Sequence, residues 1–147
     1  MPIGALSAAH TRVVSDIIAL IIPRYPEMDA AAQAQAQCDV TAFVGSQIAG
    51  MPSFLRVPYK LALSAFAALP LLRYGRTFTR LDAEARARYL AQWSDAPIGV
   101  MRNFVKLIRS CAVLAYFDHP LVMRHLEAEH QTSHAASPSA VPEVAAL

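Results

Sequence analysis

Apolar residues recur at every third or fourth position along most of this chain, and prolines or glycines interrupt the pattern at intervals. Between Ser7 and Pro23, for example, they stand at Val13, Val14, Ile17, Ile18 and Ile21. This spacing gathers side chains on one face of an α-helix, whereas half-buried strands need apolar and polar residues to alternate. The sequence contains no such alternation and no internal repeat. It therefore predicts an all-α fold.

The 147 residues match the length of a single domain with its own core. Ser7 and Asp82 are suited to cap helices, and Pro97 fits the first position of another. We expect five to six helices, at 7–22, 28–49, 53–74, from 82 onward, 97–117 and 118–128, with a kink or break at Pro58 and Pro70. Core stripes are expected at Val40, Phe43, Val44 and Ile48, and at Leu81, Ala85, Tyr89 and Trp93.

The C-terminal end differs in composition from the rest. From Gln131 onward the sequence is rich in serine, proline and alanine and has few large apolar residues. Such a segment buries too little apolar surface to offset the entropy lost on ordering. We therefore expect a compact helical domain over 1–130 and a disordered tail over 131–147.

Charge is scarce and unevenly distributed. Charged residues make up 16% of the chain and hydrophobic residues 55%, against about 25% charged in typical soluble domains. The sequence therefore predicts an apolar face committed to a partner protein or a membrane. Residues 56–124 carry eleven Lys or Arg and four Asp or Glu, a net charge of +7. These charges match no nucleic-acid-binding motif, so we expect no nucleic-acid partner.

We expect neither a signal peptide nor a transmembrane helix in this sequence. Its longest uncharged apolar stretch, 61–72, has 12 residues, short of the roughly 20 that span a bilayer. Cys38 and Cys111 lie in apolar helical patterns, and no CxxC or Cys/His zinc spacing occurs. We expect two buried free thiols rather than a disulfide.

The residues best suited to catalysis have simpler structural explanations. Asp118 and His119 are adjacent, and we expect Asp118 to cap a helix whose first turn holds Pro120. His125 and His130 are five residues apart, whereas two metal ligands on one helix face stand four apart. The five glycines are scattered, unlike those of a dinucleotide-binding loop. We expect no catalytic residue, metal site or cofactor site in this chain.

The predicted fifth helix offers a candidate interaction surface. It is apolar on nearly every face, but Arg102, Lys106 and Arg109 form one basic stripe at helical spacing. Two interpretations remain open. The stripe is either the solvated edge of a core helix or a surface that meets carboxylates of a second chain.

An ordered set of features over residues 74–126 resembles a known group of proteins. Its first part is F-x-x-L-D-x-x-x-R, followed by L-x-x-W. A proline and a basic helix follow, and the set ends in an aromatic pair with D-x-P. The residues are Phe78, Leu81, Asp82, Arg86, Leu90, Trp93, Pro97, Arg102, Phe104, Lys106, Tyr116, Phe117, Asp118 and Pro120. This order is similar to the helical region before the flavin domain of long-chain alcohol oxidases. It also resembles small proteins encoded beside glucose–methanol–choline (GMC) type flavin dehydrogenases and, more distantly, the small subunit of gluconate 2-dehydrogenases.

The resemblance implies a non-catalytic small subunit that supports the folding, stability or placement of a large dehydrogenase subunit. The FAD and the catalytic histidines would lie on that partner. Gluconate-type small subunits carry a twin-arginine signal, and this sequence has no twin-arginine pair. We therefore expect a cytoplasmic protein, with contact to the inner membrane face left open. The candidate interface residues are Trp93, Arg102, Phe104, Lys106, Arg109, Tyr116 and Phe117.

Two alternatives remain. In one, the chain is a peripheral membrane protein anchored through 54–72, a segment of Phe, Leu and Tyr bordered by Arg56, Lys60 and Arg73. In the other, it is a helical enzyme that uses His119 or Cys111.

Overall fold

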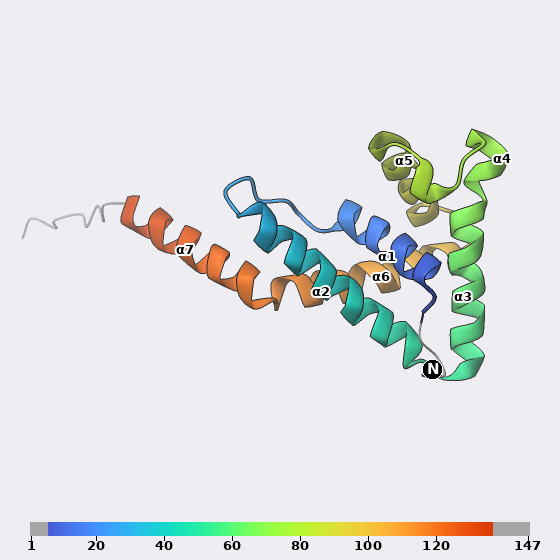
Figure 1. Ribbon diagram of the computed structural model, residues 1–147, viewed down its shortest axis with the longest axis horizontal. Helices are drawn as coiled ribbons and strands as arrows, with labels where there is room; N and C mark the ends of the chain where they lie inside the picture. The colour runs from blue at the N-terminus through green and yellow to red at the C-terminus, as the bar shows by residue number, and fades with distance from the viewer. Residues whose placement is uncertain (1–5, 137–147) are drawn as a thin grey trace, which may run out of the picture.

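The computed structural model describes residues 6–136, which form helices joined by short turns and contain no strand (Figure 1). The all-α fold expected from the sequence is confirmed. The elements in chain order are α1 (Ala8–Ile21), α2 (Ala30–Ala49), α3 (Ser53–Ala68), α4 (Pro70–Tyr74), the 3-10 turn η1 (Phe78–Arg80), α5 (Ala83–Ser94), α6 (Gly99–Phe117) and α7 (Pro120–Ala136).

The predicted helix over 53–74 is present as α3 and α4, which are separated at Leu69. Pro70 causes this interruption because it has no backbone N–H to continue the hydrogen-bond ladder. The helix continues through Pro58, so a break there does not occur. Pro58 lies close to the helix start, where the carbonyl of exposed Phe54 can bind water in place of the missing N–H. Gly75 ends α4 with a left-handed φ of 68°.

The predicted helix caps are largely confirmed. The Ser7 hydroxyl accepts a hydrogen bond from the His10 amide at 3.2 Å, and an Asp82 carboxylate oxygen accepts one from the Ala85 amide at 2.7 Å. Pro97, however, precedes α6 and does not occupy its first position. The helix begins at Gly99 with Ile98 as its N-cap.

One half of the core is a cluster of aromatic rings centred on Phe66 of α3. Its ring centroid lies 4.7–5.5 Å from those of Phe78, Tyr89, Trp93 and Phe104, which come from η1, α5 and α6. The aliphatic half joins α1, α2 and α6. It contains Val14, Ile17, Ile18, Val40, Val44, Ile108 and Ala112. α1 packs against both α2 and α6. Because α6 contributes Phe104 to the aromatic half and Ile108 and Ala112 to the aliphatic half, it runs through both halves of the core.

Two expectations about buried residues are wrong. Cys38 is exposed and Cys111 is only half-buried, although both are free thiols as expected. Phe43 is 38% exposed, whereas Val40, Val44 and Ile48 of the same helix are buried. Cys38 and Phe43 both lie on α2, whose neighbours cover a narrower face than its apolar pattern indicates, whereas Cys111 lies on α6.

α7 is longer than the sequence predicts. It runs to Ala136 rather than to about Ala128, so residues 131–136 of the predicted tail are helical. The remainder of that tail, 137–147, lies outside the described residues. The Thr132 hydroxyl donates a hydrogen bond to the Ala128 carbonyl within this extension. α7 projects from the bundle at the end opposite α3, and Val122 is its buried residue (Figure 1).

Candidate partner-binding surface

The seven predicted interface residues divide into a buried and an exposed group. Trp93, Phe104 and Tyr116 are buried within the chain, at 5%, 2% and 0% exposure, so they belong to the core. Their aromatic side chains fill the space where α3, α5 and α6 meet or, for Tyr116, where α6 meets the segment after α1. The exposed group is Arg102, Lys106, Arg109 and Phe117.

The basic stripe of α6 is exposed along its length. Arg102 donates a hydrogen bond from Nη1 to the Ala96 carbonyl at 2.8 Å and so helps to fix the turn between α5 and α6. Lys106 and Arg109 form no hydrogen bond or ion pair within residues 6–136. These two side chains can therefore meet carboxylates from outside the chain.

An apolar groove of about 440 Å³ lies between α3 and the first half of α6. Its floor is the stacked pair Tyr59 and Phe104, with ring centroids 5.1 Å apart, and the Tyr59 hydroxyl donates to the Phe104 carbonyl at 2.9 Å. Leu55 and Val100 stand on its rim, 51% and 72% exposed. The lining residues are Met51, Leu55, Pro58, Tyr59, Ala62, Val100, Asn103, Phe104 and Leu107. The groove was not predicted, because it depends on the angle between two helices.

The F-x-x-L-D-x-x-x-R motif is a structural clamp. Arg86 Nε donates to the Phe78 carbonyl at 3.2 Å, and its Nη2 donates to the Thr79 carbonyl. Its Nη1 also lies 3.8 Å from Asp16 Oδ1 of α1. Arg86 thus binds the 3-10 turn to both α5 and α1. The motif therefore positions helices.

The hydrogen bonds of the His119 side chain are made with α2 and α7 rather than with Asp118. His119 Nε2 lies 2.8 Å from Asp39 Oδ2 on α2, and its Nδ1 accepts a hydrogen bond from the Leu121 amide at 3.3 Å. His119, and not Asp118, therefore caps α7, because its ring is turned back onto the first turn. Asp118 ends α6 instead. The hydrogen bond from His119 lowers the pKa of Asp39 below its ordinary value.

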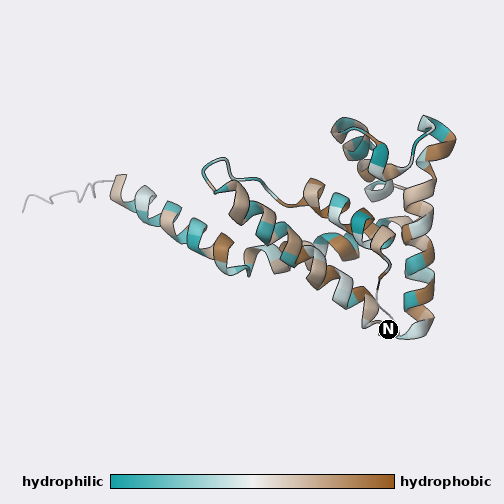
Figure 2. Cartoon of the chain, viewed as in Figure 1, coloured by the Kyte–Doolittle hydropathy of each residue, from teal (hydrophilic) through white to brown (hydrophobic). Residues whose placement is uncertain are grey.

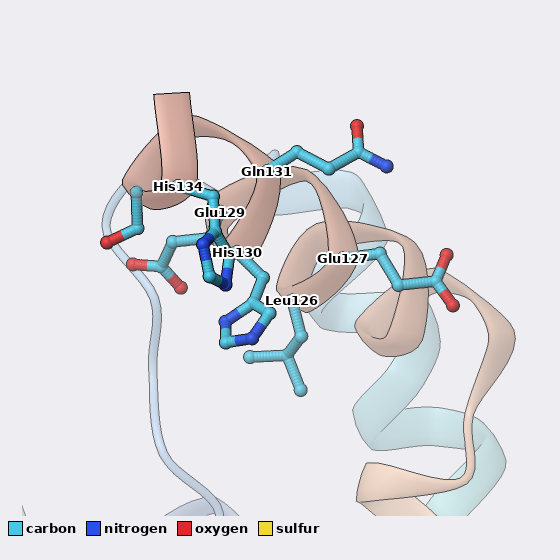
Figure 3. A pocket seen from close by; sticks show the side chains of 7 residues that line it. Leu126, Glu127, Glu129, His130, Gln131 and His134 are labelled. Atoms are coloured by element: carbon cyan, nitrogen blue, oxygen red, sulfur yellow. The ribbon is translucent and has the colours of Figure 1, made fainter. Parts of the chain in front are cut away.

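The histidines of α7 form a pair that the sequence interpretation overlooked. His130 and His134 are four residues apart, share one face and have ring centroids 5.1 Å apart, close to Leu126 and Glu129 (Figure 3). The i, i+4 spacing was the signal that could have identified them. His125, by contrast, packs its ring against Tyr25. Within residues 6–136 no group of three or more metal-ligating side chains is assembled.

Taken together as one helical segment, α3 and α4 (Ser53–Tyr74) are long and apolar enough to cross a membrane when length and composition alone are considered. This segment exceeds the longest uncharged stretch of the sequence because it includes Arg56, Lys60 and Arg73. Only 17% of its most apolar 18-residue stretch is buried inside the chain. In Figure 2 this helix is mostly brown to pale, with narrow hydrophilic turns.

Comparison with known proteins gives one match. The family model described as gluconate 2-dehydrogenase subunit 3 matches residues 8–132, which include every helix but the last turn of α7. Neither a curated protein nor a solved structure matches the chain. Since the family model covers most of the sequence, the chain belongs to the gluconate 2-dehydrogenase subunit 3 family.

Proposed function

We propose that this protein is a non-catalytic accessory subunit that binds and stabilises the large subunit of a dehydrogenase complex. The family description, which names a dehydrogenase subunit, supports this assignment. The ordered motif shared with proteins encoded beside GMC-type flavin dehydrogenases supports a large subunit of that type. FAD and the catalytic histidines are then expected on the large subunit.

The observation that carries the proposal is the apolar groove between α3 and α6. Protein interfaces have an apolar centre with a polar rim, and large side chains that fill pockets contribute most of the binding energy. The groove has the lining to accept an aliphatic or aromatic side chain. Lys106 and Arg109, further along α6, would meet acidic residues at the rim of the same contact.

The residues around the groove are arranged so that it persists without a partner. Tyr59 joins α3 to α6 through its stacking contact and its hydrogen bond to the Phe104 carbonyl. Phe104 is fixed in turn by Phe66 and Trp93, with ring centroids 5.5 and 5.3 Å away. A preformed groove loses little conformational entropy when a partner binds, which favours a stable complex.

The test is co-expression of the tagged chain with a large GMC-type flavoprotein subunit, the proposed partner. We expect the wild-type chain to retain a yellow flavoprotein whose flavin absorbance is measured after purification. Val100→Asp should reduce the retained flavin by about tenfold or more, because it places a carboxylate on the apolar rim. Asp at the second position of α6 suits the helix dipole, so the variant should still fold.

The matched control is Val57→Asp, the same substitution on the other side of α3, where Val57 is 56% exposed. It should leave the retained flavin unchanged. Equal retention by the two variants would place the contact elsewhere. A large subunit that is soluble and fully active without this chain would contradict the accessory role.

A further inference from the structure

The outer face of α3 and α4 is a continuous apolar surface that no other described element covers. Its four most prominent members are Phe54, Val57, Leu61 and Leu72, which are 73%, 56%, 66% and 88% exposed. Between them lie Pro58, Ala65, Ala68 and Leu69. Together these eight residues are called the outer stripe.

The outer stripe follows helix geometry from end to end. Its members recur at three- and four-residue intervals from 54 to 72, so they share one side of the helix over roughly 27 Å. The opposite side is occupied, because Leu63 and Phe66 are fully buried against the core. The helix therefore lies along the edge of the bundle with one side committed and the other open (Figure 1).

The charges around the outer stripe have one sign. Residues 40–81 contain five Lys or Arg and no Asp or Glu. Helical spacing places Lys60 on one border of the stripe and Arg73 on the other. Arg76 and Arg80, both exposed, follow in the segment after α4. Arg56 is engaged within the chain instead, since its Nη1 donates a hydrogen bond to the Ala49 carbonyl at 3.1 Å.

We propose that the outer stripe binds the surface of an anionic lipid bilayer, with the helix lying in the plane of the membrane. An apolar helix face with basic borders gains both from burial among acyl chains and from attraction to acidic headgroups. No member of the stripe has a hydrogen-bonding side chain, whereas protein interfaces form about one hydrogen bond per 100–200 Å². The helix does not cross the bilayer, because Leu63 and Phe66 hold its other side in the core.

This binding mode is independent of the proposed accessory role. The two surfaces share Pro58, but the groove otherwise uses Leu55, Tyr59 and Ala62, which lie on the neighbouring side of α3. Lipid binding and partner binding therefore depend on different substitutions. A protein that uses both surfaces holds its partner at a membrane, where lipophilic substrates or electron acceptors are dissolved.

Vesicle flotation of the full chain tests the proposal. We expect the wild-type protein to float with phosphatidylcholine vesicles that contain phosphatidylglycerol, and about tenfold less with phosphatidylcholine alone or at high salt. Phe54→Ser/Leu61→Ser/Leu72→Ser should reduce flotation at least about tenfold. The matched control, Ile98→Ser/Val100→Ser/Leu114→Ser, removes three exposed apolar residues of the α6 segment and should float like wild type. Circular dichroism establishes that both triple variants fold.

A second measurement does not rely on loss of binding. Phe54→Trp introduces a fluorophore into the outer stripe, and brominated lipids should quench its emission, whereas Trp93 is buried and should remain unquenched. The proposal is overturned if the wild-type chain fails to float or if the two triple variants float equally. It is also overturned if the protein is a dimer that the outer-stripe variant converts to a monomer, since a second copy would then cover the face.

Discussion

α3 and α6 are both rich in apolar residues, yet they use them in opposite ways. α6 contacts α1, α2, α5 and α7, and its buried residues form a regular series. The series is Phe104, Val105, Ile108, Ala112 and Tyr116. α3 lies at the edge of the bundle and buries Leu63 and Phe66, while its outer stripe faces away from the chain. Position in the bundle, rather than composition, decides which apolar residues become core.

The difference separates two tasks within one small domain. α6 holds the core together and, in the proposed complex, offers its charged edge and half of the groove to the partner. α3 provides the other half of the groove on one side and the outer stripe on the other. Because 16% of the residues are charged, a surface of this kind was expected, and one alternative interpretation of the sequence placed it on residues 54–72.

The largest effect should come from the inner side of α3. Phe66→Ala removes the ring at the centre of the aromatic cluster and should lower the free energy of unfolding by about 3–5 kcal/mol. Leu61→Ala, on the outer stripe of the same helix, should change it by no more than about 0.5 kcal/mol. Urea denaturation followed by circular dichroism measures both values. Similar losses in the two variants would mean that both sides of α3 are covered.

A smaller effect is expected where α3 meets α6. Tyr59→Phe removes the hydrogen bond to the Phe104 carbonyl and should cost about 1 kcal/mol at neutral pH. The same denaturation experiment detects this change. Val113→Ala, at a half-exposed position of α6, is the control and should have little effect.

The difference in stability between wild type and Tyr59→Phe should also depend on pH in the alkaline range. Burial raises the pKa of Tyr59 above its ordinary value of 10, so the folded state holds the neutral phenol more tightly than the unfolded state does. The stability that the buried Tyr59 phenol contributes is fully present below about pH 10 and is lost as the pH rises further. The gap between wild type and Tyr59→Phe should therefore narrow above about pH 10. A gap that widens would contradict the assigned burial of the hydroxyl.

The smallest effect on stability should come from the charged edge of α6. Lys106→Ala/Arg109→Ala should alter the free energy of unfolding by no more than about 0.5 kcal/mol, because neither side chain has a partner within residues 6–136. With this variant, less flavoprotein should co-purify, and the amount retained should depend less on the salt concentration than it does with wild type. A large loss of stability would show that the stripe belongs to the fold and not to an interface.

Much of the fold could be predicted from local signals. Ser7 and Asp82 cap the helices assigned to them, and Pro23, Pro70 and Gly75 stand where helices end or break. The buried series Leu81, Ala85, Tyr89 and Trp93 also follows directly from helical spacing. These features depend on residues only a few positions apart, so the local sequence is enough to predict them.

The candidate site was harder to predict because it depends on how helices are placed. Trp93 and Phe104 look suited to an interface, but α3 and α5 enclose them. His119 caps α7 because Asp39 of a distant helix orients its ring. The groove and the exposed outer stripe likewise arise from the position of α3 at an edge. The basic stripe is exposed, which agrees with both interpretations of it, since charge alone keeps it in water.

The hydrogen bond from the Tyr116 hydroxyl to the Pro23 carbonyl joins residues 93 positions apart. The large separation of these two residues in the sequence sets the order in which the helices can assemble during synthesis. α1 leaves the ribosome long before α6 exists, and at typical translation speeds the delay is roughly 5–20 s. Throughout that interval Val14, Ile17 and Ile18 lack the helix that completes their burial. The nascent protein is therefore exposed to aggregation from its N-terminal end, and any factor that assists its production would act there first.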